Sequence, residues 1–204
     1  MIIYSLGTQC ATRPFYLPGV PVSSTEHEAA VGAGGEQFAA CSGAPKRSSR
    51  LVDVKSIVFK VGSGKSAGEV KSSVEVFPSS TLAARNFAAG GSARGRSCIV
   101  KLLPRLLGER AASRVELKGM TVSKLAVPQS SASHAFGLRL RVSLIGKGLN
   151  STRSAPEIYI DSLTLLAGPA EVALTALQLG GPPSPSIDSR LFKLLAERAR
   201  SHAA

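Results

Sequence analysis

Residues 136–145 read Phe136-Gly137-Leu138-Arg139-Leu140-Arg141-Val142-Ser143-Leu144-Ile145, and this stretch decides the fold class. Leucine and valine side chains alternate with two arginines and a serine, so one face of the segment is apolar and the other is polar. A repeat of two residues is typical of a β-strand that buries one face. The segment therefore predicts a half-buried strand.

The flanking sequence repeats this strand pattern on both sides. Ala167-Gly168-Pro169-Ala170 carries the composition of a tight hairpin turn, and Gly62-Ser63-Gly64-Lys65-Ser66 has that of a hairpin loop. The further strands that the alternation predicts cover residues 51–61, 69–77, 114–127, 158–166 and 171–179.

Three segments predict helices. Pro78-Ser79-Ser80-Thr81 offers hydroxyls that cap free backbone N–H groups, and the Ala-rich residues 82–89 follow it. A second helix is expected over residues 98–107, where Pro104 should kink or shorten it. Residues 186–199 form a third, amphipathic helix.

The predicted element order is ββααββββα, with the helices grouped rather than alternating with strands. This order indicates an α+β fold in which an antiparallel sheet of about six strands is covered by helices. Residues 1–40 are rich in Pro, Gly and Ser without a sustained period, so we expect a flexible arm there. Residues 41–204 then form a single α+β domain, because 204 residues suffice for one sizeable core.

Positive charge is concentrated in one part of the chain. Of the formal net charge of +12, residues 85–147 carry twelve basic residues against Glu109 and Glu116. Three interpretations stay open: a solvated basic face, a surface for an anionic envelope polymer, lipid head group or acidic protein, or a nucleic-acid interface. The residues expected to bind an anionic partner are Arg94, Arg96, Lys101, Arg105, Arg110, Arg139, Arg141 and Lys147.

No constellation in the chain predicts catalysis, and we expect no enzyme, cofactor or metal. The Gly-Lys-Ser at residues 64–66 resembles the end of a phosphate-binding loop, but Phe59 stands where that motif needs glycine and a strand follows. His134 lies in a serine-rich loop and is expected to be exposed. The three cysteines and three histidines lack metal-ligand spacing, and Asn150-Ser151-Thr152 fits a glycosylation acceptor to which we assign no role.

Three segments together show a resemblance to a known group of proteins. They are residues 38–43 (Phe-Ala-Ala-Cys-Ser-Gly), residues 70–79 (Val-Lys-Ser-Ser-Val-Glu-Val-Phe-Pro-Ser) and residues 94–98 (Arg-Gly-Arg-Ser-Cys). The chain resembles bacterial cell-envelope proteins similar to LpqN-type lipoproteins, which are sensor-like single domains with a PsbP-like fold. The resemblance covers roughly residues 38–200 and includes the Glu157–Asp161 strand and the Gly-Gly-Pro-Pro of residues 180–183.

The resemblance implies that Cys41 and Cys98 form a disulfide, which would require an oxidising compartment. The alternative is two buried free thiols. It also implies a non-catalytic, extracytoplasmic module that holds a small apolar ligand, a lipid or an envelope component. No apolar run is long enough to span a membrane, and residues 1–6 lack the basic start of a signal peptide.

The implied disulfide indicates an oxidising compartment, whereas the missing export signal indicates the cytoplasm, so two locations stay open. Either the start of the chain is truncated and the protein is extracytoplasmic, or the protein is cytoplasmic and the disulfide is not formed. The second case leads to a different function, in which a nucleic-acid-associated protein uses the Arg/Lys-rich face. The sequence leaves the oligomeric state open.

Overall fold

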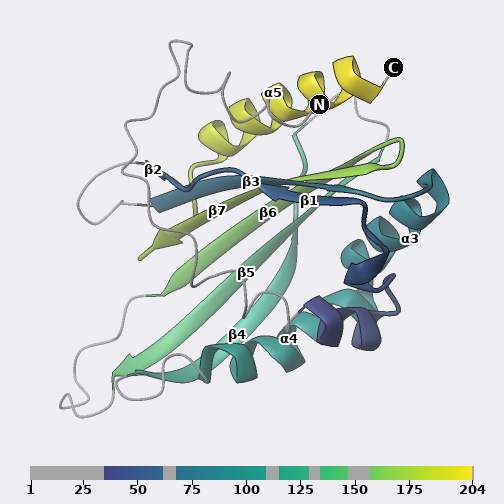
Figure 1. The fold of residues 1–204 in the computed structure, drawn as a ribbon. Helices are drawn as coiled ribbons and strands as arrows, with labels where there is room; N and C mark the ends of the chain where they lie inside the picture. Colours follow the sequence, from purple (N-terminus) through teal and green to yellow (C-terminus); the bar gives the residue numbers. More distant parts are fainter. Residues whose placement is uncertain (1–34, 62–67, 109–114, 129–133, 147–156, 204) are drawn as a thin grey trace.

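The computed structural model describes residues 35–61, 68–108, 115–128, 134–146 and 157–203. It contains one antiparallel sheet with helices packed on it, in the predicted order (Figure 1). Residues 35–42 are helical. The strands are β1 (Val52–Lys55), β2 (Phe59–Val61), β3 (Gly68–Val76), β4 (Val115–Leu125), β5 (Ala135–Gly146), β6 (Ile158–Ala167) and β7 (Ala170–Leu179). The remaining helices are η1 (Arg47–Ser49), α3 (Ser80–Gly91), α4 (Ala93–Gly108) and α5 (Pro185–Ala203).

The sheet has seven strands because the first predicted strand is broken. β1 and β2 both pair antiparallel with β3, through Lys55↔Ser73 at the end of β1 and Phe59↔Val70 at the start of β2. Between these two pairs, residues 56–58 lie opposite only residues 71 and 72 of β3. Ser56 lies at this bulge, where its hydroxyl accepts a hydrogen bond from the amide of Ser72 at 2.9 Å. A side-chain oxygen thus replaces a backbone acceptor, and the strand bends.

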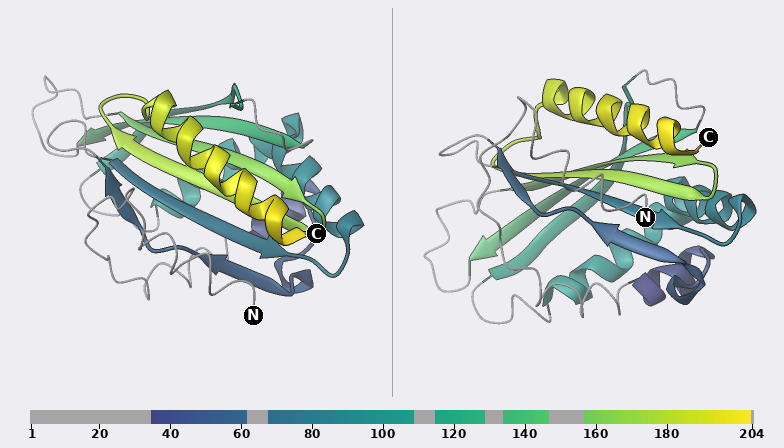
Figure 2. Two further views of the ribbon diagram at one scale, coloured as in Figure 1. Left: turned by 90° about the horizontal axis from the view of Figure 1, so that it is seen from above. Right: turned by 45° about the horizontal axis from the view of Figure 1, so that its top comes forward.

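The strand order is β1-β3-β7-β6-β5-β4, with β2 beside β3. β4 to β7 are joined by successive antiparallel pairings, and the Gly168–Pro169 turn between β6 and β7 has the positive φ of 57° at glycine that tight hairpins favour. α3 and α4 connect β3 to β4, which is the strand at the far edge of the sheet. α3 packs on β5, β6 and β7 and α4 packs on β4, so the two helices cover one face. α5 follows β7 and lies across the opposite face (Figure 2).

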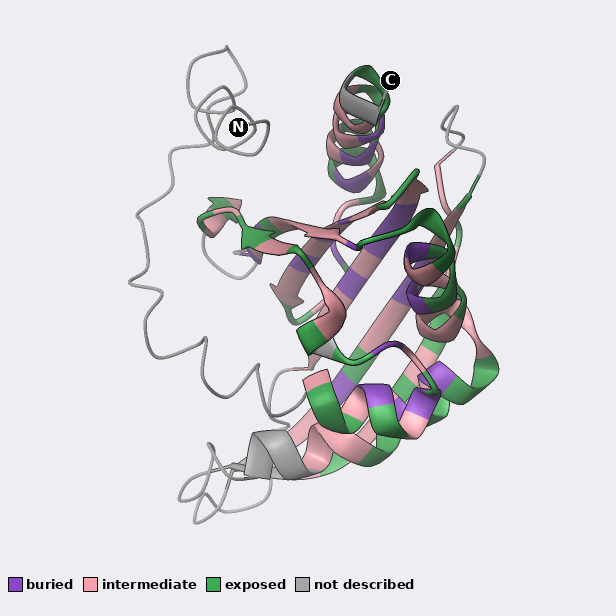
Figure 3. Ribbon diagram, turned by 45° about the vertical axis from the view of Figure 1, so that its right-hand side comes forward, coloured by how far each residue is buried: buried purple, intermediate pink, exposed green. Residues whose placement is uncertain are grey.

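The main core lies between α5 and the sheet. In Figure 3, buried residues run along α5 and across the central strands. Phe192 and Ala196 of α5 pack on aliphatic side chains that alternate along β3, β6 and β7. Those side chains are Val70, Leu163, Leu165, Val172, Leu174 and Ala176.

Serine hydroxyls cap the start of α3 and the junction between α3 and α4, where a glycine also permits close packing. Ser79 caps α3, because its hydroxyl accepts a hydrogen bond from the amide of Leu82 at 3.3 Å. Ser92 joins α3 to α4, since its hydroxyl accepts a hydrogen bond from the amide of Gly95 at 2.8 Å and donates one to the carbonyl of Ala89, also at 2.8 Å. A Cβ at Gly95 would lie 2.2 Å from that carbonyl oxygen, so only glycine fits this close junction.

Two predicted boundaries differ from the observed ones. The helix over residues 35–42 includes residues that the sequence assigned to the arm, and Ala39 within it is buried. α4 begins at Ala93 rather than residue 98 and continues past Pro104 to Gly108. In both cases packing on the rest of the domain extends a segment whose local composition gives a weak helix signal. Residues 1–34 lie outside the described residues.

Candidate functional site

A mainly apolar cleft of about 310 Å³ lies between the N-terminal end of α5 and strands β2, β3 and β7. Aliphatic and proline side chains form most of its wall, and Gln178, Ser184 and Asp188 supply the polar groups. Small-molecule sites have this character, with a largely apolar lining and a few polar groups. The other lining residues are Val61, Val70, Ala176, Leu177, Pro182, Pro183 and Ile187.

The segment between β7 and α5 creates this space. Gly180 adopts a positive φ of 77° and its amide donates a hydrogen bond to the carbonyl of Glu157 at 2.8 Å, which turns the chain away from the sheet. Pro182 and Pro183 follow and have no N–H to donate to the sheet. Pro185 then opens α5, a position where proline is favoured because the amide would have no helical partner. The loop therefore spans the end of the sheet instead of packing into it.

A buried acidic cluster adjoins the cleft. Asp161 of β6 is 1% exposed and accepts two hydrogen bonds from Arg139 of β5, from Nε at 2.7 Å and from a terminal nitrogen at 2.6 Å. Asp188 of α5 is 5% exposed, and its Oδ1 has no hydrogen-bond partner among the described residues. All three side chains line a smaller hollow of about 50 Å³, and Asp188 also lines the large cleft.

Burial and charge determine how this cluster titrates. Burial raises the pKa of Asp188 to about 6, and the neighbouring Asp161 raises it further while Arg139 opposes the shift. Hydrogen bonding to Asp161 raises the pKa of Arg139. Asp188 is therefore a carboxyl group beside the cleft that gains or loses its proton close to neutral pH.

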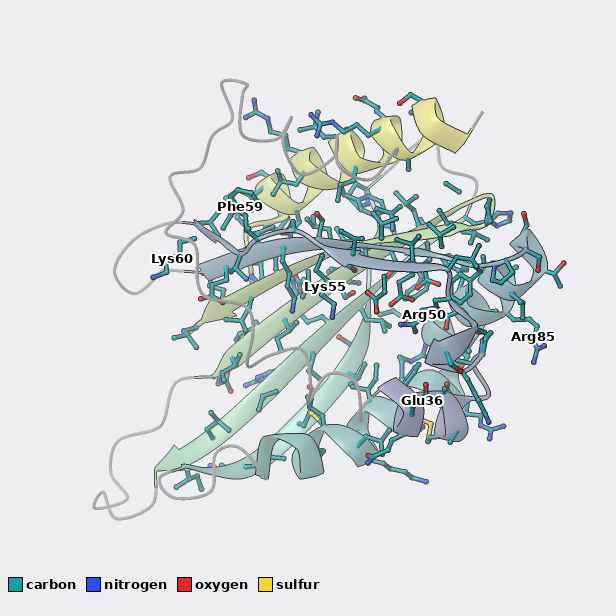
Figure 4. The ribbon with its side chains drawn as sticks, viewed as in Figure 1. Glu36, Arg50, Lys55, Phe59, Lys60 and Arg85 are labelled. Carbon is teal, nitrogen blue, oxygen red and sulfur yellow. A yellow bond between two sulfur atoms is a disulfide. The ribbon has the colours of Figure 1, made fainter. Side chains whose placement is uncertain are left out.

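The opposite face of the sheet contains another acid with a raised pKa, the partly buried Glu171. Glu171 of β7 accepts a hydrogen bond from the amide nitrogen of Asn86 in α3 at 2.8 Å. Burial raises the pKa of Glu171 to about 7, which the hydrogen bond from Asn86 opposes, while the charge of Glu75 adds to the shift. Arg50, which Figure 4 labels, forms an ion pair with Glu75 at 2.8 Å. This cluster links α3, β3 and β7.

Four of the eight predicted anion-binding residues make contacts within the protein. Arg139 pairs with Asp161, and Arg141 pairs with Glu157. Arg94 donates a hydrogen bond to the carbonyl of Cys41 at 2.7 Å, and Arg96 donates one to the carbonyl of Gly91 at 2.9 Å. Lys101 is exposed on α4. The side chain of Arg105, and all of Arg110 and Lys147, lie outside the described residues.

A disulfide joins Cys41 to Cys98, with Cα atoms 5.8 Å apart and 57 residues between them in sequence. This is the pairing that the family resemblance implied. Cys98 is buried in α4, so the bond attaches the helix over residues 35–42 to α4. The hydrogen bond from Arg94 to the Cys41 carbonyl joins the same two segments.

The other predicted motifs add little chemistry. Residues 62–66 lie outside the described residues, but β2 and β3 on either side of them pair antiparallel, as in a hairpin. His134 is exposed, as predicted, and Asn150-Ser151-Thr152 lies outside the described residues. Within the described ranges, no group of His, Cys, Asp and Glu side chains could hold a metal ion. None of the described helices combines the length and apolar character that crossing a bilayer requires.

Asp161, Asp188 and Glu171 were not among the residues predicted from the sequence. A usable signal existed for Asp161, since it interrupts the apolar residues of a predicted strand and a buried carboxylate requires a cationic partner. Its partner Arg139 lies 22 residues away. Only the register of β5 and β6, which places Arg139 opposite Asp161, brings the two together.

Comparisons with known proteins identify no family. No family model matches the chain, and no curated protein does. Among solved structures, the chain is similar to the extracellular domain of PknH from Mycobacterium tuberculosis, with 8% identity and a TM-score of 0.36, over 82% of this chain and 69% of that one. A similarity at this level gives no basis for transferring a function.

Proposed function

We propose that this protein is a non-catalytic, sensor-like binding module of the bacterial cell envelope. It holds a small apolar ligand, a lipid or an envelope component in the cleft beneath the start of α5. The observation that supports this proposal is the cleft itself, because its size and apolar lining match those of ligand sites.

Two further features favour a binding role outside the cytoplasm. The Cys41–Cys98 disulfide is a bond that persists in oxidising compartments. Asp188 lines the cleft, and burial raises its pKa to about 6. The raised pKa of Asp188 then serves to adjust binding with pH rather than to transfer protons during a reaction.

Binding of the neutral apolar dye N-phenyl-1-naphthylamine tests the cleft directly. We expect fluorescence enhancement with the wild-type protein and a loss of about tenfold in affinity for Ile187→Gln, since Ile187 lines the cleft and loses apolar contact area. Leu179→Gln is the matched control, because Leu179 is 44% exposed against 38% for Ile187 but lies outside the cleft lining. Equal binding by both variants would contradict the proposal.

Salt-dependent nucleic-acid binding distinguishes the alternative function. A nucleic-acid-associated protein with a net charge of +12 would bind duplex DNA with an affinity that falls steeply as salt rises. The binding-module proposal predicts weak retention of DNA at physiological salt and co-purification of an apolar molecule, measured by organic extraction and mass spectrometry. Tight, salt-sensitive DNA binding without a bound apolar molecule would overturn it.

A further inference from the structure

The face of the sheet that bears α3 and α4 contains a row of polar side chains across three strands. Lys71 of β3 is opposite Thr175 of β7, and Thr175 is opposite Ser162 of β6. All three residues retain solvent exposure, unlike the buried side chains under α5. Side chains in one row of adjacent strands lie about 5 Å apart, so a single small group can contact several of them.

A second lysine joins this row from the edge of the sheet. Lys55 of β1 is opposite Ser73, which lies two residues from Lys71 on the same strand and therefore on the same face. In Figure 4 the side chain of Lys55 points away from α5, toward the side of α3 and α4. Lys55 and Lys71 are diagonal neighbours, a spacing that long side chains can bridge.

The charge of Lys55 acts on the neighbouring Lys71. Partial burial lowers the pKa of Lys71, and the charge of Lys55 lowers it further, while Glu69 acts in the opposite direction. Two cations that repel each other gain most from an anion placed between them. Thr175 and Ser162 add hydroxyl donors on the same side.

An apolar row runs beside the polar one. Leu177 of β7 is opposite Ile160 of β6, which is opposite Leu140 of β5. Each of these residues is partly exposed and lies two positions along its strand from the polar row or its continuation, a separation of about 7 Å. Polar donors and an aliphatic strip thus lie side by side on one face.

We propose that this face binds an amphiphile with an oxyanion head, held by Lys55, Lys71, Thr175 and Ser162, with its hydrocarbon chain along Leu177, Ile160 and Leu140. The site lies on the face opposite to α5, whereas the cleft of the proposed function lies on the α5 side, and Leu177 is the one residue named in both. Charge supports the assignment, because the cleft contains the acid Asp188, whereas this face presents Lys55 and Lys71 against one acid, Glu69, which lies opposite Leu177. The head group is a carboxylate or a phosphate, both of which accept charge-assisted hydrogen bonds from ammonium and hydroxyl groups.

Calorimetric titration with three twelve-carbon probes, each below its micelle concentration, tests the head group. We expect sodium dodecanoate or dodecyl phosphate to bind, and the tighter of the two identifies the head. Dodecylammonium chloride should bind at least about tenfold more weakly, because its head is repelled by both lysines. Equal binding of the cationic probe would overturn the proposal.

Paired variants test the residues. Lys55→Met/Lys71→Met should weaken binding of the anionic probe by about 10- to 100-fold, the range expected for loss of hydrogen bonds to a charged group. Lys46→Met/Lys193→Met removes the same charge from two other exposed lysines and should leave binding unchanged. Lys55→Arg/Lys71→Arg keeps the charge and should retain most of the affinity. Equal weakening by the two methionine pairs would indicate general electrostatic attraction and contradict the site.

Amide chemical shifts separate this site from the cleft. The anionic probe should shift the amides of Ser162 and Thr175, whereas N-phenyl-1-naphthylamine should shift those of Val70 and Ile187. If dodecanoate shifts only the cleft amides, this inference is wrong while the proposed function stands. If the dye fails to bind and dodecanoate shifts Ser162 and Thr175, the proposed function is wrong and the inference stands.

Discussion

The two faces of the sheet are built from the same strands but differ in how completely they are buried. In β6, Leu163 and Leu165 point to α5 and are fully buried, whereas Ile160 and Ser162 point to the other side and remain partly exposed. The α5 face has an apolar core beside the buried cluster of Arg139, Asp161 and Asp188, whereas the opposite face is a mixture of apolar packing, ion pairs and hydroxyls. The alternation along each strand supplies side chains to both faces of the sheet. How deeply those side chains are buried therefore depends on the helix that packs on each face.

Each face also holds one acid whose pKa is raised toward neutral pH. Asp188 lies at the start of α5 beside the cleft, and Glu171 lies under α3 with Asn86. Burial is the largest cause of the raised pKa in both cases. On the α5 face, the neighbour of Asp188 is a second carboxyl group, that of Asp161. On the opposite face, Glu171 accepts a hydrogen bond from the side-chain amide of Asn86.

Removing the disulfide should have the largest effect. Cys41→Ser/Cys98→Ser should lower the free energy of unfolding by about 4 kcal/mol, because the bond closes a separation of 57 residues. Urea unfolding measures this loss, and wild-type protein with reductant should match the variant. Hydrogen exchange should show the loss first in α4 and residues 35–42, with α5 still protected. Loss of protection in α5 at the same rate would show that the two faces unfold together.

A matched pair in β6 compares the faces directly. Leu163→Ala removes a side chain that is 2% exposed and should cost about 3 kcal/mol in stability. Ile160→Ala removes a side chain of the same size on the other face and should cost about 1 kcal/mol, because water already reaches it. Urea unfolding of the two variants checks the difference. Equal losses would mean that the second face is as tightly packed as the first.

Glu171 should make stability depend on pH. The folded chain keeps this proton up to a pKa of about 7, and the unfolded chain releases it near 4.5, so stability falls as the pH rises between these values. The loss for this group is up to about 3 kcal/mol. Glu171→Gln should remove this slope, since its amide oxygen still accepts the hydrogen bond from Asn86, and should stabilise the protein at pH 8.

Thermal unfolding at pH 5 and pH 8 measures the Glu171 effect. Asp188→Asn is the comparison on the α5 face, because it removes a carboxyl group whose raised pKa has the same sign. Each variant should flatten part of the pH dependence, and the double variant should flatten more than either one. A slope unchanged by Glu171→Gln would contradict the assignment of this group.

The smallest expected effect concerns the cap of α3. Ser79→Ala should destabilise the protein by about 1 kcal/mol, because the amide of Leu82 loses its acceptor. Ser79→Gly should cost only a small part of this, since glycine leaves the amide open to water. Urea unfolding resolves both values. A large loss for Ser79→Gly would indicate that Ser79 supports the opposite face through more than its cap.

The sequence predicted the elements well because their signals are local. The alternation in residues 136–145, the turn at Gly168–Pro169 and the cap at Ser79 each depend on a few adjacent residues. The break at Ser56 escaped prediction, although the apolar residues change there from even positions (Val52, Val54) to odd positions (Ile57, Phe59), and the pairing with Ser72 locates the extra residue. The charge pattern was less informative, because a row of arginines in sequence does not show that Arg139 pairs with Asp161.

Taken alone, the sequence determined the α+β class, the order of strands and helices and the overall positive charge. Only the tertiary structure decided that β3 pairs with β7, that α5 covers one face and that Asp188 and Glu171 titrate near neutral pH. The physical reason is the sequence separation over which each interaction acts. Periodicity and capping involve residues within a few positions of each other, whereas desolvation and charge pairing depend on groups that folding brings together from distant parts of the chain.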